Sequence, residues 1–179
     1  MTRLTIYNED ASGAQSYTEF DEIAAKLGAA GVEFERWAAD RPLSPDADQE
    51  QVLAAYWDAI DKLNARYGFQ SMDVVSLRPD HPNKAEFREK FLSEHTHGDF
   101  EVRFFVDGRG LFYLHLGDKV YAVLCEQGDL ISVPAATTHW FDMGREPDFK
   151  CIRLFTTPEG WVGDFTGSDI AGRFPDFDA

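Results

Sequence analysis

The amino-acid sequence predicts a single, mainly β domain with N-terminal helices, whose short antiparallel strands form a closed or sandwiched barrel of the jelly-roll type. The length of 179 residues suits one domain with a sizeable core rather than two. Short apolar runs separated by tight turns dominate the second half, and the first half mixes helical and strand patterns. We therefore expect one domain over 1–179, with a helical or mixed part at 1–92, a barrel core at 93–158 and an irregular C-terminal tail at 159–179.

Three helices are expected in the N-terminal part. The segment 16–19 (Ser-Tyr-Thr-Glu) resembles a capping box, and apolar residues follow it at helical spacing. Asp46 opens a longer helix that closes near Gly68, and Asn83 is expected to cap the third helix. Strand character between the helices is expected at 32–37 and 73–77.

Six short strands are expected in the barrel core. The segment 107–110 is interpreted as the turn between the first two strands, and Gly117-Asp118 as a two-residue hairpin turn before the third. The Gly- and Asp-rich tail, which includes Trp161, is expected to wrap the barrel. The expected strands are 102–106, 111–116, 119–124, 130–133, 139–143 and 150–155.

The acidity of the chain excludes some classes of partner. The formal net charge is -15 and no basic cluster relieves it locally, so nucleic acid and anionic membrane surfaces would repel the protein. The same charge favours a soluble monomer. The N-terminus lacks the basic and apolar regions of a signal peptide, and no apolar run reaches the roughly 18 residues of a membrane span, so we expect a cytoplasmic protein.

The two cysteines, Cys125 and Cys151, lie in strand-like apolar runs. They could form one disulfide, but two buried thiols in a reducing compartment are the favoured interpretation. No cysteine or serine pairs convincingly with a histidine, so the sequence does not indicate nucleophilic catalysis.

Four residues form the most informative pattern in the chain, namely His95, His97, Glu101 and His139. They read as His-x-His, a carboxylate four residues later and a more distant histidine, and they include three of the 5 histidines. Three imidazoles and one carboxylate suit Fe(II), Ni(II), Co(II), Mn(II) or Zn(II), whereas a soft metal would require thiolate. A lone His-x-His usually has no function, but the carboxylate and the third histidine make a metal site the favoured interpretation.

Strand geometry explains how these residues can meet. His95 and His97 share one face of a strand, about 6.5 Å apart along the backbone, so both can reach one ion. On a continuous strand Glu101 would lie about 13 Å beyond His97, too far for bonds of about 2.1 Å to a shared metal. We therefore expect a turn at 98–99, after which Glu101 returns on the neighbouring strand and Arg103 points into the same cavity.

Two stretches resemble the motifs of the cupin superfamily. The stretch from His95 to Gly108 is similar to the first motif, which places His-x-His, Glu and Gly at this spacing. The stretch from Gly128 to His139 is similar to the second motif and has Pro134 in place. Ala136 and Met143 depart from it, because they replace the usual Gly and Asn.

The chain resembles the acireductone dioxygenase family in particular. The residues that carry this resemblance are 95–98 (His-Thr-His-Gly), 101–105 (Glu-Val-Arg-Phe-Phe), 133–135 and 139–142. The resemblance extends over nearly the whole chain and implies a methionine-salvage enzyme that oxidises 1,2-dihydroxy-3-keto-5-methylthiopentene with O2. It implies 4-methylthio-2-oxobutanoate and formate as products with Fe(II), or 3-methylthiopropanoate, formate and carbon monoxide with Ni(II), and one ion per chain.

The resemblance also implies roles for individual residues. The metal ligands would be His95, His97, Glu101 and His139. Arg103 matches the catalytic arginine that orients the substrate, and Glu94 matches an acid that assists metal loading. Phe100 departs from the family pattern, since many members have an acid immediately before the ligand Glu. The aromatic residues expected to bind substrate are Phe91, Phe141 and Trp161.

Two alternatives to this dioxygenase remain open from the sequence. One is a non-catalytic cupin that uses the ion to hold a small ligand or to stabilise the barrel. The other is a different cupin oxygenase or an isomerase. Arg103 likewise has two compatible interpretations, because it can stabilise an anionic enediolate or anchor Glu101 beside the metal.

Overall fold

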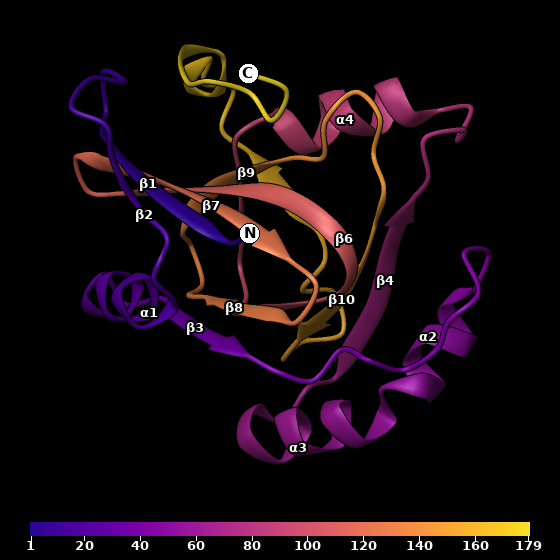
Figure 1. Ribbon diagram of the computed structural model, residues 1–179. Helices are drawn as coiled ribbons and strands as arrows, with labels where there is room; N and C mark the ends of the chain where they lie inside the picture. Colours follow the sequence, from indigo (N-terminus) through magenta and orange to yellow (C-terminus); the bar gives the residue numbers. More distant parts are fainter.

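The computed structural model describes all residues from 1 to 179 and shows a β-barrel with helices on its outside (Figure 1). The long strand β6 (Glu101–Leu116) belongs to both antiparallel sheets of the barrel. Its first part pairs with β8 (Asp129–Val133) and β10 (Phe149–Phe155), and its second part pairs with β7 (Lys119–Glu126) and β9 (Thr138–Asp142). The mainly β, jelly-roll architecture predicted from the sequence is thus confirmed.

Strands from both ends of the chain complete the two sheets. The first sheet runs in the order β11-β5-β9-β6-β7-β1-β2, and the second joins β3, β8, β6, β10 and β4. The N-terminal part therefore contributes four strands to the barrel as well as its helices. The bounds of the remaining strands are β1 (Arg3–Asn8), β2 (Gln15–Tyr17), β3 (Glu33–Arg36), β4 (Ser71–Leu77), β5 (His95–His97) and β11 (Gly163–Phe165).

The helices differ from the sequence prediction mainly at their beginnings. The expected capping box at 16–19 is wrong, because Ser16 lies in β2 and bonds to Thr5, and α1 begins after Glu19 without a side-chain cap. Asn83 makes no side-chain cap to α4 either. The helix expected from Asp46 to Gly68 is two helices, α2 and α3. The bounds are α1 (Phe20–Ala29), α2 (Gln49–Ala55), α3 (Trp57–Tyr67), α4 (Lys84–Leu92) and the short 3-10 helix η1 (Ile170–Arg173).

The turn expected at 107–110 is also wrong, since β6 continues through this segment. Gly108 has a φ of 66°, in the left-handed region, and a Cβ there would overlap the carbonyl oxygen of Asp148. A β-bulge lies beside it in β6, because Lys150 of β10 pairs with Asp107 and Cys151 pairs with Phe105, which leaves Val106 without a partner in the ladder. These two irregularities bend β6 where it passes from one sheet to the other, whereas the hairpin at Gly117-Asp118 forms as predicted.

The core divides according to the faces of the two sheets. Alternate residues of β6 point into the barrel, where Phe105 packs with Phe112 and Phe141, while Phe104 faces outward onto α2 and α3. The C-terminal segment covers the outer face of the first sheet through Phe174. Both cysteines are free and buried in the barrel interior, as predicted. None of the helices combines the length and the apolar character needed to span a membrane.

Candidate metal centre

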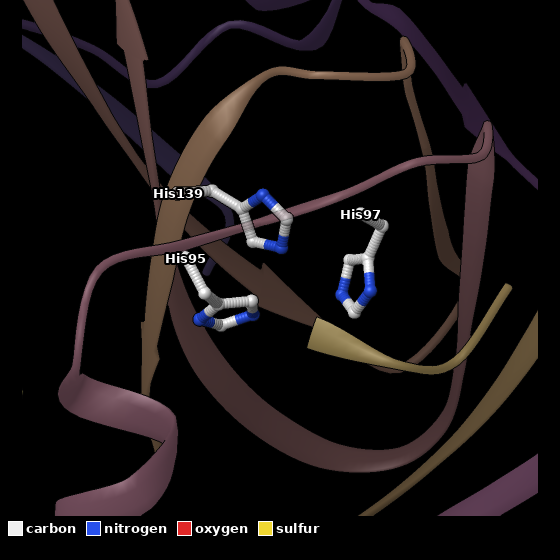
Figure 2. A group of neighbouring side chains, drawn as sticks. All are labelled: His95, His97 and His139. Atoms are coloured by element: carbon white, nitrogen blue, oxygen red, sulfur yellow. The ribbon is translucent and has the colours of Figure 1, made fainter. Parts of the chain in front are cut away.

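Three histidine side chains converge inside the barrel (Figure 2). His95 and His139 are direct partners in the ladder between β5 and β9, and His97 follows on the same face of β5. One nitrogen of each ring lies within 4.8 Å of one nitrogen of both other rings. All three residues are buried, so the cluster forms a compact set of nitrogen ligands that can hold one metal ion.

Glu101 adds an oxygen to this cluster. Its Oε2 lies 3.5 Å from Nε2 of His97 and 3.5 Å from Nε2 of His139, while its Oε1 accepts a hydrogen bond of 2.6 Å from Arg103. The predicted break in the strand at 98–99 is present. The predicted neighbouring strand is wrong, because the start of β6 pairs with β8 and β10 and not with β5. Glu101 therefore approaches from the second sheet, across the barrel from His97.

Backbone carbonyl groups orient the three imidazoles. Nδ1 of His95 lies 2.8 Å from the carbonyl oxygen of Ser93, and Nδ1 of His139 lies 2.8 Å from that of Thr137. Nδ1 of His97 lies 3.0 Å from the carbonyl oxygen of Val162. Because a carbonyl can only accept, each Nδ1 must carry the proton, which leaves each Nε2 with a free lone pair.

Burial and the charge of Arg103 together favour the metal-binding protonation states of His95, His139 and Glu101. Burial lowers the pKa of His139 to about 3 and also lowers the pKa of His95. Burial alone would raise the pKa of Glu101. The positive charge of Arg103 is the strongest of the effects that oppose this, and together they hold the pKa of Glu101 well below its usual range. Neutral imidazole and ionised carboxylate are the forms that bind a metal, so these residues are ready to act as ligands.

The unsatisfied atoms of the centre fit a divalent cation. Nε2 of His97, Nε2 of His139 and Oε2 of Glu101 are buried and have no hydrogen-bond partner within the protein. Buried polar atoms without a partner are rare in native proteins and require an explanation. A cation bound between these atoms and His95 would satisfy all of them, and the mixed nitrogen and oxygen set suits Fe(II) or Ni(II) among other borderline ions.

Arg103 is fully buried next to the cluster. Its Nε donates to Glu101, whereas Nη1 and Nη2 have no partner within the protein. The guanidinium carbon lies 4.8 Å from the ring centre of Phe112 and 5.2 Å from that of Phe141, so aromatic faces hold the group in place. Both interpretations of Arg103 are compatible with this geometry, since Nε anchors Glu101 while Nη1 and Nη2 have no partner within the protein.

A pocket of about 290 Å³ opens onto His95 and His97. Phe91 and Trp161 line this pocket, as expected for substrate-binding residues, and Trp161 is 55% exposed. Phe141 instead is fully buried and does not line the pocket, but its ring packs on Phe91. The assignment of these aromatic residues to substrate binding stays a prediction.

Glu94 lies on the other side of β5 from the metal-binding face. Its buried carboxylate accepts a hydrogen bond of 2.8 Å from Thr166, and Nδ1 of His115 lies 3.4 Å from it. These contacts link Glu94 to the C-terminal segment through Thr166 and to β6 through His115. They leave its predicted part in metal loading untested.

Three further side chains that line the pocket were not among the residues predicted from the sequence, namely Lys90, Arg153 and Phe165. Lys90 is exposed and forms no ion pair, whereas Arg153 pairs with Asp73 through bonds of 2.8 and 2.5 Å. Arg153 pairs with Arg103 in the ladder of β10 and β6, so the strand pattern could have indicated it. Phe165 had no comparable signal, because it lies in the segment interpreted as irregular.

Phe100, the departure from the family pattern, points away from the metal centre. Its ring centre lies 5.1 Å from that of Tyr67 in α3, and it packs against the outer face of the second sheet. An apolar residue at this position therefore stabilises the contact between the barrel and a helix.

The fold and the centre together define a class of protein. Three imidazoles and a carboxylate inside a jelly-roll barrel are the hallmark of a metal-binding cupin. The model of the ARD/ARD' family matches residues 3–163, and the chain belongs to this family.

Similar proteins support this assignment over the full length. An acireductone dioxygenase of Methylococcus capsulatus is 64% identical over 176 residues, which cover 98% of this chain and 95% of the relative. An acireductone dioxygenase of Aquifex aeolicus is 57% identical over 178 residues, covering 99% and 97%. The structure of an acireductone dioxygenase from Bacillus anthracis has been solved with a cadmium ion in its active centre. It superposes on this chain with a TM-score of 0.79 at 31% identity, and the match covers 92% of this chain and 98% of that one.

Proposed function

We propose that this chain is a metal-dependent dioxygenase, an oxidoreductase of methionine salvage that cleaves the acireductone 1,2-dihydroxy-3-keto-5-methylthiopentene with O2. The observation that carries the proposal is the buried centre whose inward atoms have no partner within the protein. The family supplies the reaction, because relatives 64% and 57% identical to this chain are named acireductone dioxygenases.

One Fe(II) or Ni(II) ion per chain is proposed to bind His95, His97, Glu101 and His139. Oε2 of Glu101 is the proposed ligand atom, because it has no partner within the protein and lies next to His97 and His139, whereas Oε1 accepts from Arg103. When bound, the ion would act as a Lewis acid and as a template for the two enediol oxygens of the substrate. The products would be 4-methylthio-2-oxobutanoate and formate with Fe(II), and 3-methylthiopropanoate, formate and carbon monoxide with Ni(II).

Arg103 is the proposed catalytic residue of the protein itself. The net charge of -15 should repel an anionic enediolate, so a positive group is required inside the site. Nη1 and Nη2 of Arg103 are buried and unpaired, and they can donate charge-assisted hydrogen bonds to the enediolate oxygens. The bond from Nε to Glu101 keeps the guanidinium in position while it does so.

Aromatic residues are proposed to receive the methylthio tail and to exclude water. Phe91 and Trp161 line the pocket, and the buried ring of Phe141 packs against Phe91. Glu94 is proposed to assist metal loading. The cytoplasmic location and the monomeric state stay predictions from the sequence.

Oxygen uptake with freshly generated acireductone tests the proposed function. The protein would be stripped of metal, reconstituted separately with Fe(II) and with Ni(II), and its products separated by chromatography. We expect uptake with both ions and a different product set for each. Absence of uptake with either ion, despite stoichiometric metal binding, would favour a non-catalytic cupin or a cupin with another substrate.

A pair of variants tests the part of Arg103. Arg103→Met should retain metal and lose turnover by about 10²-fold or more, the usual effect of removing a group that stabilises charge in the transition state. Arg109→Met is the matched control, because Arg109 lies in the same strand but is exposed and remote from the pocket. Unchanged turnover of Arg103→Met with bound metal would refute the catalytic assignment.

A further inference from the structure

The three imidazoles differ in what holds them. The carbonyl groups that orient His95 and His139 lie two residues earlier in sequence, next to the strands that carry these histidines. His97 instead depends on the carbonyl of Val162, which is 65 residues away in sequence. In Figure 2 a yellow segment from this C-terminal region passes beside His97. The position of one metal ligand therefore depends on how a distant loop is fixed.

Asp99 fixes that loop to the turn that follows His97. Its carboxylate is buried, and its two oxygens accept four hydrogen bonds. Oδ1 accepts from the backbone N–H of Phe100 at 2.7 Å and from the hydroxyl of Thr156. Oδ2 accepts from the backbone N–H of Thr157 at 2.8 Å and from its hydroxyl at 3.2 Å.

The loop packs closely against this carboxylate. A Cβ at Gly160 would lie 2.5 Å from Oδ2 of Asp99 and 2.6 Å from Cβ of Phe155, so only glycine allows the approach. From there the chain turns, with a hydrogen bond of 3.0 Å from Val162 N to the carbonyl of Glu159. The turn delivers the Val162 carbonyl to His97, and the next residue begins β11, which pairs with β5.

We propose that Asp99 is a positioning residue for the metal ligand His97. By holding the loop 156–162 against the 98–100 turn, it keeps the Val162 carbonyl on Nδ1 of His97 and so directs Nε2 of that ring into the metal centre. The inference rests on the proposed metal-dependent function. It concerns only the protein's own residues, and it can be tested without turnover.

The chemistry of the contact identifies a sharp substitution. All four groups that face Asp99 are donors, and a carboxylate is the side chain that can accept from all of them. Asp99→Asn keeps the shape but replaces one oxygen with an NH2 group, which would face donors and accept nothing. The loop should then detach from the turn, and the Val162 carbonyl should no longer hold His97.

The decisive measurement is the tautomer of each imidazole in the metal-free protein, read from long-range ¹H–¹⁵N NMR correlations at about pH 8, where histidines are neutral. In the wild type all three ligand histidines should carry the proton on Nδ1. In Asp99→Asn we expect His97 to populate both tautomers while His95 and His139 keep theirs. The dissociation constant for Ni(II), measured by titration, should rise about 10–100-fold, as is usual when the partner of a ligand histidine is lost.

Two further variants make the test selective. Asp10→Asn is the matched control, because Asp10 also accepts a backbone N–H and a hydroxyl in a turn but lies in the exposed loop between β1 and β2. It should change neither measurement. Thr156→Val removes only one of the four donors and should shift His97 in the same direction by a smaller amount; it decides the question if Asp99→Asn does not fold.

Three results would overturn the inference. In the first, Asp99→Asn folds and its His97 tautomer and Ni(II) affinity match the wild type. In the second, the tautomers of all three histidines change equally. In the third, His97 of the wild type does not carry its proton on Nδ1. None of these results bears on oxygen uptake by the wild type, so the proposed function would stand or fall separately.

Discussion

The ion pair between Glu101 and Arg103 should stabilise the metal-free barrel by an amount that can be measured. Both side chains are buried, and Glu101 is the carboxylate in ion-pair contact with Arg103. Replacing Glu101 with glutamine keeps the shape but leaves the guanidinium buried without a counterion. Arginine does not release its proton inside proteins, so it cannot escape this cost by becoming neutral.

The expected loss follows from the burial of the pair. Removing one partner of a buried ion pair destabilises a protein by about 3–5 kcal/mol. For a chain of this length 1 kcal/mol corresponds to about 2–4 °C in Tm, so metal-free Glu101→Gln should melt about 6–20 °C below the wild type. Circular dichroism during heating in the presence of a chelator measures this difference.

A double variant separates the charge from the packing. Glu101→Gln combined with Arg103→Met removes both charges, and it should recover much of the stability that the single substitution loses. Saturating Ni(II) should raise the Tm of the wild type far more than that of Glu101→Gln, because the variant lacks one of the four proposed ligands. A metal-free single variant that melts within about 2 °C of the wild type would refute the reasoning.

Three other outcomes are expected. Gly108→Ala should lower the free energy of unfolding by about 3 kcal/mol, since the added methyl group would overlap backbone atoms. Gly117 has a similar φ but lies in open space, so Gly117→Ala should lower it by only about 1 kcal/mol. Urea titration measures both, and equal losses would contradict this. Burial alone would raise the pKa of Asp142, but the ion pair with α4 and two backbone N–H groups lower this pKa. The ionised carboxylate therefore stabilises the fold above about pH 4, and this stabilisation is lost as the pH falls through the folded-state pKa. Below about pH 4, the Tm of Asp142→Asn should therefore depend less on pH than that of the wild type. A curve of unchanged slope would contradict this. Lys90→Met should reduce kcat/KM about fivefold at low salt, which corresponds to losing about 1 kcal/mol from one exposed charge, and it should weaken the dependence of kcat/KM on salt. Lys62→Met, on the remote helix α3, is the control and should change neither quantity.

The alternation of side chains along a strand explains what the sequence could predict. His95 and His97 share a face because strand side chains repeat every two residues, and the same rule correctly placed Arg103 beside Glu101. The need to bring Glu101 back to the ion predicted the turn at 98–99. These inferences succeed because they depend only on residues close together in sequence.

The predictions that were wrong concern residues whose structure depends on partners far away in the sequence. Gly108 and Gly110 have the composition of a tight turn, but β6 continues through them because β10 and β7 pair with its two halves. Ser16 matched a capping box, but β2 takes it into the sheet beside Thr5. The same limit hid Asp99, whose contacts with Thr156 and Thr157 lie 57 and 58 residues away.

Most of the buried polar atoms that lack a hydrogen-bond partner lie in the proposed metal centre. Of the seven buried side-chain atoms without a partner, five belong to His97, Glu101, Arg103 and His139. Each such atom destabilises the metal-free protein, because its interactions with water have been lost without replacement. The rigid strands keep these atoms from finding partners elsewhere, so their unused bonding capacity remains directed at the space where an ion and a substrate are proposed to bind. The stability lost in folding such a centre is therefore expected to return as affinity when the ion binds, and metal binding and folding should be measurably coupled.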